Sequence, residues 1–376
     1  MANTTDNFNS SLANTTHHLI KNTRITALIR IWMSFVLPCL IGAGLLLNPI
    51  IIIIMNKKKV SIKNRMRFYY TTLACGDVLT LLIVHFGQGY LGDGLKWATS
   101  GAYYIYIPRL SSFLCKFGWA AWFCCLIFSN YTLMLLSFER CMFVCFPFWA
   151  RKFFTWKNTI ICWSLLTLPS MIFLSALIWM VNDLVESPYT EGGIDCLLTP
   201  DHPLYYINCI PACIIVFTIH CIVIAICNII ITTKLNKAAS RRNSMSSVQI
   251  QLHQMMAMAK TIRRLSAVAG LTSKEVHATI TLTLISTIQC LLYIPKSVFC
   301  FLFCHFSSDT HHPQLSTSEM DLRNDIGHLN YLFTYVCAVG CVINIFVYIA
   351  RVPSFRSYVL CALSSRSDTS VDLAHH

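Results

Sequence analysis

Charged residues are scarce in this sequence. Only 12% of its 376 residues are Asp, Glu, Lys or Arg, whereas 55% are hydrophobic. The mean hydropathy is correspondingly high, at +0.58. Because about a quarter of the residues in an ordinary soluble domain are charged, this composition excludes a soluble globular protein.

Other features are missing from the sequence, and each absence excludes a class of protein. We find no internal repeat of the kind that transporters carry as paired halves, which argues against a transporter. An intramembrane enzyme would need a catalytic acid and base or a cluster of metal ligands within the spans, and we find neither, which argues against such an enzyme. A seven-span transporter or channel stays the alternative to the interpretation developed below.

Long hydrophobic runs dominate what is present. Each run is near or beyond the roughly 20 residues that a membrane-spanning helix needs. The runs cover residues 31–55, 68–91, 113–146, 158–181, 204–232, 276–303 and 329–349. The sequence therefore predicts an all-α fold, a seven-transmembrane helix bundle over residues 31–350, set in a lipid bilayer.

The net charge of +13 could indicate nucleic acid binding, and the 19 cysteines could indicate a metal or disulfide scaffold. However, the Lys and Arg residues lie in short loops between the spans, as membrane topology requires. Most cysteines lie inside the apolar runs, where Cys behaves as a small hydrophobic residue. We therefore predict neither a nucleic-acid partner nor a cysteine-rich scaffold.

Residues 1–30 form a polar tail with three glycosylation sequons, at Asn3, Asn9 and Asn14. Three clustered acceptors before the first span indicate that this tail lies outside the cell. No apolar segment typical of a signal peptide precedes them, so we expect the first span itself to direct insertion.

The distribution of basic residues predicts the same orientation. Six Lys and Arg residues and no acid lie between residues 57 and 67, directly after the first span. The loops after the third and fifth spans are also basic, and the positive-inside rule makes all three cytoplasmic. The protein is thus predicted to lie in the plasma membrane with an extracellular amino terminus and a cytoplasmic carboxyl terminus.

The two long outward loops are acidic. They hold nine acids and one base: Asp183, Glu186, Glu191, Asp195, Asp201, Asp309, Glu319, Asp321 and Asp325, against Arg323. Such a field would concentrate and steer cations, which favours a ligand with basic groups. The alternative is that these acids merely complement the membrane topology.

The third apolar run carries a distinctive residue at each end. Cys115 lies near its start and the charged pair Glu139-Arg140 lies near its end. At 1.5 Å per residue these landmarks are about 37 Å apart, enough to place them in opposite interfaces of a hydrocarbon core about 30 Å thick. Glu139 and Arg140 must then face the cytoplasm or a protein cleft, although Arg140 could also reach lipid phosphates.

Residues 351–376 follow the last span. Pro353 can begin a short amphipathic helix that lies on the inner membrane surface. Cys361 at its end is a candidate for palmitoylation, and a free thiol is the alternative.

Taken together, these landmarks resemble those of rhodopsin-like (class A) G-protein-coupled receptors over nearly the whole chain. The marks are Asn48 in the first span, Leu73-Ala74-Cys75-Gly76-Asp77 in the second, Glu139-Arg140-Cys141 in the third, Trp163 in the fourth, Pro211 in the fifth, Pro295 in the sixth and Asn344-Ile345-Phe346-Val347-Tyr348 in the seventh. The resemblance implies a receptor without enzymatic activity that couples an extracellular ligand to a heterotrimeric G protein.

The sequence departs from the family pattern at four positions. Cys141 replaces the usual Tyr of the third-span motif, and Ile345 replaces the proline of the seventh, so the helix there keeps an amide donor. Tyr293 stands where the family usually has Trp, and Ile219 where a Tyr is common. These changes indicate a divergent member, of the neuropeptide-receptor type, whose activation pathway cannot be copied from relatives.

The resemblance implies two further sites. Cys115 and Cys196 are both extracellular, where disulfides persist, and Cys196 is the only cysteine of its acidic loop, so we predict a bond between them. Asp77 is the only acid at mid-membrane depth, and the family places Ser129 and Asn344 beside it. Oxygen ligands suit a sodium ion. The alternative is a protonated Asp77 that only hydrogen-bonds its neighbours.

The family's activation switch maps onto residues at the cytoplasmic side and the core. We predict that Arg140 pairs with Glu275 in the resting state, because Glu275 lies twenty residues before Pro295, or about 30 Å along the sixth helix. The alternative is that both face solvent. The complete predicted switch is Glu139, Arg140, Glu275, Tyr293, Pro295, Asn344 and Tyr348.

Two absences narrow the ligand. Trp122 occupies the place of the Asp that binds amines in aminergic receptors, and Ala338 the place of the lysine that holds retinal in opsins. The mixture of aromatic and polar residues in the outer half suits a peptide, which we expect, or an amphipathic small molecule. Lys296 would bind an acceptor group deep in the cavity unless it reaches lipid headgroups. The predicted ligand-binding residues are Gln88, Trp119, Trp122, Phe123, Gln289, Tyr293 and Lys296.

Overall fold

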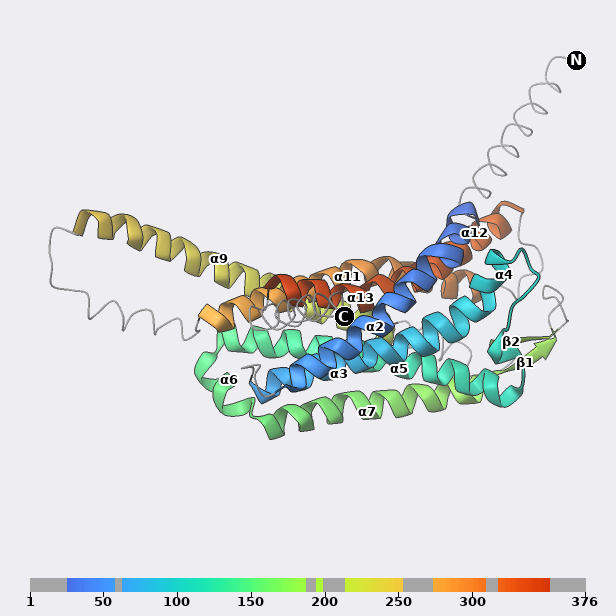
Figure 1. The fold of residues 1–376 in the computed structure, drawn as a ribbon, viewed down its shortest axis with the longest axis horizontal. Helices are drawn as coiled ribbons and strands as arrows, with labels where there is room; N and C mark the ends of the chain where they lie inside the picture. The colour runs from blue at the N-terminus through green and yellow to red at the C-terminus, as the bar shows by residue number, and fades with distance from the viewer. Residues whose placement is uncertain are drawn as a thin grey trace, which may run out of the picture.

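The computed structural model describes residues 26–57, 63–186, 194–198, 214–252, 273–308 and 317–351. Within them, seven helices are long and apolar enough to cross a membrane, and they form one bundle (Figure 1). The predicted seven-helix, all-α architecture is confirmed. Asn3, Asn9, Asn14, Cys361 and the amphipathic helix predicted after residue 351 lie outside the described residues and stay predictions.

The helices match the predicted apolar runs, although most extend further. The membrane-length segments are Thr26–Asn56, Asn64–Ala98, Ser112–Cys145, Trp156–Val181, Val216–Lys237, Thr279–Phe303 and Asp325–Asn344. The helices are α2 (Leu37–Asn56), α3 (Asn64–Thr80), α4 (Leu95–Ala98), α5 (Ser112–Cys145), α6 (Pro147–Phe153), α7 (Trp156–Val181), α9 (His220–Leu252), α11 (Ser273–Ser308), α12 (Thr317–Val336) and α13 (Ala338–Arg351). In Figure 1, α9 projects beyond one end of the bundle.

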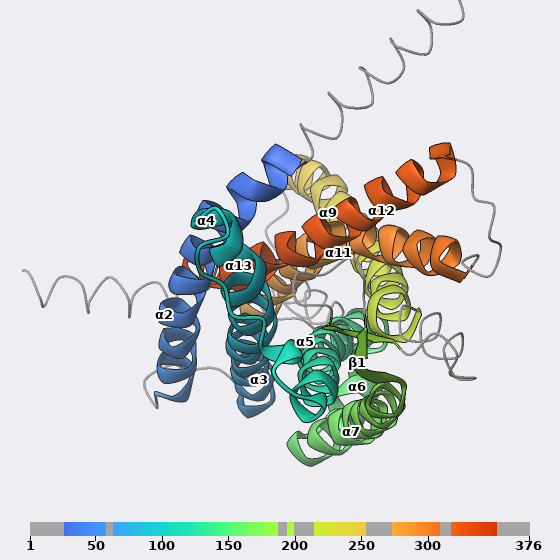
Figure 2. The ribbon, with the colours of Figure 1, turned by 90° about the vertical axis from the view of Figure 1, so that its right-hand side faces the viewer.

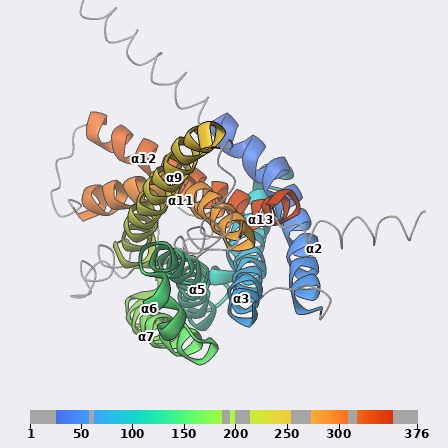
Figure 3. The ribbon, with the colours of Figure 1, turned by 90° about the vertical axis from the view of Figure 1, so that its left-hand side faces the viewer.

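Helix α5 forms the centre of the bundle. It begins where the Ser111 hydroxyl accepts a hydrogen bond from the Leu114 amide at 3.1 Å, which is a typical N-cap. It then packs against α3, α7, α9 and α11, and the two end-on views show it surrounded by other helices (Figures 2 and 3). In its most apolar stretch 61% of the residues are buried, against 17% in α7, so α7 faces mainly lipid.

Three stretches of the membrane helices are π-helical, which the sequence pattern did not predict. They are η1 (Trp32–Val36), η2 (Leu81–Gly94) and η4 (Ile214–Ile219). A π-turn holds one more residue than an α-turn, and therefore rotates the side chains that follow it. In η2 this affects His85 and Gln88, which both become buried.

The seventh membrane helix consists of two pieces. Helix α12 ends at Val336 and α13 begins at Ala338, and the break lies at Cys337, whose thiol donates to the Phe333 carbonyl at 3.2 Å. Helix α13 continues unbroken through Ile345. Ile345 retains the backbone amide that a proline would lack, so α13 is regular at this motif position. The break in the seventh helix lies about two turns earlier, at Cys337.

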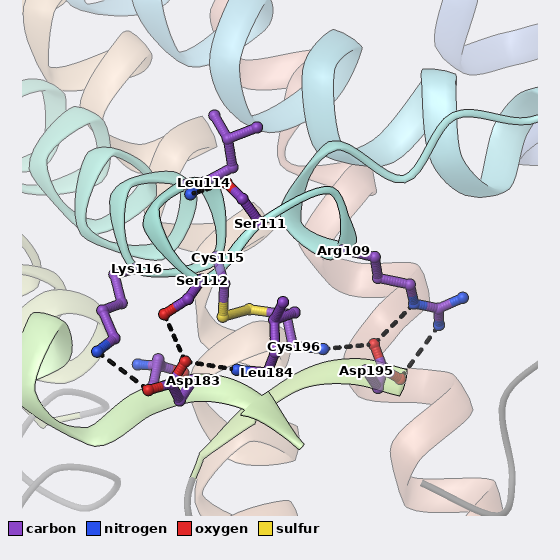
Figure 4. Close-up of a disulfide and its surroundings, with 12 residues drawn as sticks. Arg109, Ser111, Ser112, Leu114, Cys115, Lys116, Asp183, Leu184, Asp195 and Cys196 are labelled. Atoms are coloured by element: carbon purple, nitrogen blue, oxygen red, sulfur yellow. Dashed lines mark hydrogen bonds and ion pairs between the residues drawn. A yellow bond between two sulfur atoms is a disulfide. The ribbon is translucent and has the colours of Figure 1, made fainter. Parts of the chain in front are cut away.

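A hairpin covers the end of the bundle opposite α6. Strands β1 (Asn182–Glu186) and β2 (Ile194–Leu198) pair antiparallel, with Leu184 opposite Cys196. The sequence predicted only a loop here. A disulfide joins Cys196 to Cys115 near the start of α5, with the two Cα atoms 5.5 Å apart (Figure 4). The predicted disulfide is thereby confirmed.

Two ion pairs reinforce the attachment of the hairpin (Figure 4). Arg109 binds both carboxylate oxygens of Asp195, at 2.8 and 3.1 Å. Asp183 accepts a hydrogen bond from the Ser112 hydroxyl at 2.6 Å and lies 3.1 Å from the Lys116 ammonium. Two of the nine outward acids, Asp183 and Asp195, are therefore paired with cations. These cations, Lys116 and Arg109, lie outside the two long loops. The steering field expected from those acids is reduced accordingly.

The pKa shifts of these groups agree with the pairing. Hydrogen bonds from Ser112 and the Leu184 amide, together with Lys116, hold the pKa of Asp183 below its usual value despite some desolvation. Burial alone would lower the pKa of Arg109, but Asp195 outweighs burial and raises it. A carboxylate with a lowered pKa stabilises the fold above its unfolded-state pKa, near 3.9. The contribution of Asp183 is thus complete at neutral pH and is lost only as the pH falls through its lowered folded-state pKa.

We predict that Cys115 and Cys196 resist alkylation in surface-expressed protein under non-reducing conditions and become alkylated after reduction. Peptide mapping by mass spectrometry measures both states, and the single variants Cys115→Ser and Cys196→Ser give the reference for a free thiol. An alkylated thiol in the unreduced, folded protein would contradict the bond.

We also predict that Arg109→Ala loosens the hairpin more than Lys116→Ala. The Arg109 pair is bidentate and its partner carboxylate is only 14% exposed, whereas Asp183 is 43% exposed and its pair is weakened by solvent. Hydrogen exchange of the β1 and β2 amides measures the effect. Equal exchange rates in the two variants would show that the bidentate geometry adds nothing.

Candidate functional site

A small cavity lies in the outer half of the bundle, between five of the membrane helices. Its lining residues are Val84, His85, Trp122, Leu126, Phe217, Tyr293, Lys296, Thr334 and Cys337. Its space suffices for about one water molecule. It is thus far smaller than a typical ligand cavity, which measures hundreds of cubic ångströms.

Three of the seven predicted ligand-binding residues line this cavity: Trp122, Tyr293 and Lys296. Tyr293 is 4% exposed, stacks on Phe217 with ring centroids 6.3 Å apart, and meets His220 edge-on at 5.5 Å. Tyr293 therefore lies at the contact between α11 and the fifth membrane helix, where its ring can respond to changes in the cavity.

The other four predicted residues lie outside the cavity lining. The Gln88 amide donates to the Gly118 carbonyl of α5 at 2.6 Å. Trp119 stacks on Trp122 with centroids 4.5 Å apart, and Phe123 packs on the other side of Trp122 at 6.0 Å. These three residues thus support the wall around Trp122.

Gln289, the fourth, packs directly on Gly340. A Cβ atom at Gly340 would lie only 2.5 Å from the Gln289 side-chain oxygen. Here glycine leaves the space, and Gln289 of α11 fills it.

Lys296 is buried and does not reach the lipid headgroups. It is 4% exposed, and its ammonium donates to the Asn330 side-chain oxygen at 2.7 Å and to the Asn330 carbonyl at 3.4 Å. The ammonium also lies 5.4 Å from the centroid of the Phe217 ring. Its partners here are the neutral oxygens of Asn330 on α12, which no charge pattern in the sequence identifies.

A second polar centre surrounds Asp77, which is 1% exposed. The Asn344 amide donates to its carboxylate at 2.7 Å and thereby links α3 to α13. Asn48 donates to the carbonyls of Gly44 and Cys341, at 3.1 and 2.9 Å, and links the first helix to the seventh. Asp77 and Asn344 are therefore together, as the resemblance implied.

The residues around Asp77 fit a sodium ion. Ser129 Oγ, Asn344 Oδ1 and Asn48 Oδ1 are buried and have no hydrogen-bond partner among the described residues. Ser129 Oγ faces α3 next to Asp77, since a Cβ at Gly76 would lie 2.4 Å from it. No group of three His, Cys, Asp or Glu residues in the described segments could hold a metal. A cation here would thus depend on the hydroxyl and amide oxygens, which suit a hard ion.

The inner end of α5 holds a cluster of charges. Glu139 is fully buried, and its carboxylate lies 2.6 Å from Arg65 of α3 and 3.3 Å from Arg140. The Arg65 guanidinium also lies 4.3 Å from the Phe143 ring centroid, and Arg140 contacts the sulfur of Met66. In the sequence, Arg65 is one of the six basic residues that follow the first span, and nothing in the pattern identifies Glu139 as its partner.

The predicted Arg140–Glu275 pair stays a prediction. Glu275 lies in the first turn of α11 and Tyr348 in α13, but the structure describes only the backbone at both positions. Pro295 lies inside α11, one residue before Lys296, and so connects the switch region with the cavity.

Comparison with protein families gives a match over most of the chain. Residues 48–348 match the model of the 7 transmembrane receptor (rhodopsin family). A comparison with curated protein sequences gave no match.

Receptors of the matched family signal through G proteins and are not enzymes. The family match therefore sets aside the transporter or channel alternative, and it agrees with the seven membrane-length helices and the disulfide. The chain belongs to the rhodopsin family of seven-transmembrane receptors.

Proposed function

We propose that this receptor binds an extracellular peptide in the cavity around Trp122, Tyr293 and Lys296 and activates a heterotrimeric G protein at the cytoplasmic face. One observation carries the proposal: the single helix α5 holds both Trp122 in the cavity wall and the Glu139-Arg140 pair. These positions are seventeen residues apart, or about 25 Å along the helix. A change at the outer site can therefore reach the inner one through one rigid element.

The orientation in the plasma membrane is part of the proposal. The hairpin carries the disulfide, which fits an oxidising extracellular side. The opposite end carries α6 with Arg151 and Lys152, which fits the cytoplasmic side.

The mechanism is a shift between populations of a closed and an open form. The closed cavity holds no space for a peptide side chain, so a ligand must bind a wider form and thereby favour it. The G protein favours the form with an open cytoplasmic face. By linkage, each partner then raises the affinity for the other.

The aromatic and polar lining favours a peptide. Trp122, Phe217 and Tyr293 offer apolar rings, while His85, Lys296 and Thr334 offer polar groups. Such mixtures bind side chains that carry both apolar and polar parts. Basic residues of the ligand would face the outer loops, where the field now depends on acids other than Asp183 and Asp195.

The proposal is tested by screening peptide libraries on cells that express the receptor, with second-messenger readouts for each G-protein class. Cells that express Arg140→Ala at equal surface level are the matched control, since a receptor-dependent response should fall in that variant. A complete set of libraries without any receptor-dependent response would contradict a peptide ligand.

We predict that Glu275→Ala raises basal signalling and agonist potency, because it removes the partner expected for Arg140 and frees α11 from α5. Desolvation offsets much of the Coulomb gain of such a pair, so stability should change little. The neighbouring variant Lys274→Ala, at equal surface expression, should leave both quantities unchanged. If Glu275→Ala behaves like Lys274→Ala, the latch does not exist.

We further predict that NaCl raises the thermal stability of the purified receptor above that in choline chloride at equal ionic strength. Asp77→Asn should abolish the difference by removing the anionic ligand, and Ser129→Ala should reduce it. A wild-type receptor equally stable in both salts would refute the sodium site and favour an Asp77 that only hydrogen-bonds its neighbours.

A further inference from the structure

The closed cavity is rich in hydrogen-bond donors and poor in anions. Among the described residues that line it, none is Asp or Glu, and Lys296 is the only Lys or Arg. Lys296 is also nearly inaccessible to solvent, at 4% exposure. A buried ammonium without a countercharge is costly, so this site is electrostatically incomplete.

Two further lining residues carry polar atoms without partners. His85 is 1% exposed, and its Nδ1 has no hydrogen-bond partner among the described residues. The indole nitrogen of Trp122 is buried and unpartnered in the same way. The indole nitrogen is always a donor, and His85 Nδ1 is one in the tautomer that carries the proton there; a buried donor left without an acceptor is destabilising. An acceptor that entered the cavity would remove these costs.

Asn330 is a weak substitute for such an acceptor. It offers Lys296 two neutral oxygens, from its side chain and its backbone. Hydrogen bonds between an ammonium and an anion are shorter and roughly twice as strong as those between neutral groups. The backbone carbonyl of Asn330 also accepts from the Thr334 hydroxyl at 2.8 Å, so Lys296 shares this oxygen with a second donor.

We infer that the cavity takes a carboxylate group of the ligand, which replaces the Asn330 side chain as the partner of Lys296 and accepts from His85 and Trp122. This inference rests on the proposal that the ligand binds in this cavity. A carboxylate fits better than a phosphate, because one ammonium balances one negative charge and the apolar walls of Val84, Leu126 and Phe217 cannot balance a second.

The exchange couples binding to helix movement. Lys296 lies on α11 and Asn330 on α12, so their hydrogen bond ties the sixth and seventh membrane helices together in the closed form. A carboxylate is larger than the water-sized space of the cavity, and it therefore enters only when this bond opens. Ligand binding thus removes one of the contacts between α11 and α12, next to Pro295.

The probes are 4-phenylbutyrate and its uncharged amide, 4-phenylbutyramide, which share their shape and differ in charge. Each is titrated against the full-length receptor in lipid nanodiscs, with the thermal unfolding temperature as readout. We expect the carboxylate to stabilise the wild-type receptor and the amide to do so at least about tenfold less effectively, which is the size of one hydrogen bond to a charged group.

Three variants test the partner. Lys296→Met should weaken the carboxylate effect about tenfold or more, because it removes the cation. Asn330→Asp should do the same without removing the lysine, since it places a competing carboxylate on Lys296 and keeps the size of the side chain. Lys116→Met removes a lysine from the outer hairpin site and should leave the carboxylate effect unchanged.

Equal stabilisation by acid and amide, or no stabilisation by either at millimolar concentration, would overturn the carboxylate site. So would an acid effect that persists in both Lys296→Met and Asn330→Asp. The result is separable from the proposed function. If the library screen yields a peptide agonist that acts equally with a free or an amidated terminus and is indifferent to Lys296→Met, the receptor function stands and the carboxylate site fails. If the acid binds through Lys296 but no peptide signals, the peptide function fails and the site stands.

Discussion

The membrane core supplies no water to buried polar groups, and this constraint explains the polar contacts of the bundle. Asp77 accepts a hydrogen bond from the Asn344 amide, and Lys296 donates one to Asn330. Glu139 forms an ion pair with Arg65. Each of these contacts joins two different membrane helices. Because an unpartnered charge in this environment is costly, the contacts fix which helices lie together and how they are rotated.

Helix α5 connects the three levels of the molecule. Its outer end is bonded to the hairpin through Cys115, its middle forms the cavity wall with Trp122, and its inner end holds Glu139. The hairpin is fixed to it by covalent and ionic contacts, so the outer surface is rigid where it meets α5. The cavity, by contrast, contains Lys296, and in our proposal the hydrogen bond from Lys296 to the Asn330 side chain exchanges for one to a ligand carboxylate.

The departures from the family pattern have local structural consequences. Cys141, in place of the usual Tyr, packs with Cys227 and Ile231 of α9 in a small buried cluster. Ile219, at another Tyr position, is 42% exposed on the outer surface of its helix. A small or outward-facing side chain at these positions cannot form the hydrogen bonds that a tyrosine hydroxyl offers. An activation path through tyrosine hydroxyls at these two positions is therefore not available to this chain.

The sequence alone determined the number of spans, the fold class and the residues at the ends of the third helix. These features depend on hydrophobic length and on residue type, which are local properties of the chain. The Cys115–Cys196 bond was also predictable, because both cysteines were expected on the extracellular side and Cys196 is the only cysteine of its acidic loop. Likewise, the depth of Asp77 in the membrane was enough to make it a candidate site residue.

Only the tertiary structure decided which polar groups meet. Lys296 was recognised as buried, but its partner Asn330 is neutral and lies thirty-four residues away. In the sequence, Asp195 is one of nine outward acids and Arg65 is one of six inward basic residues. Only the fold shows that Arg109 pairs with Asp195 and that Glu139 pairs with Arg65. A hydrogen bond requires its two atoms to lie within about 3.2 Å. That distance depends on helix rotations and on π-turns such as η2, which hydrophobic periodicity does not resolve.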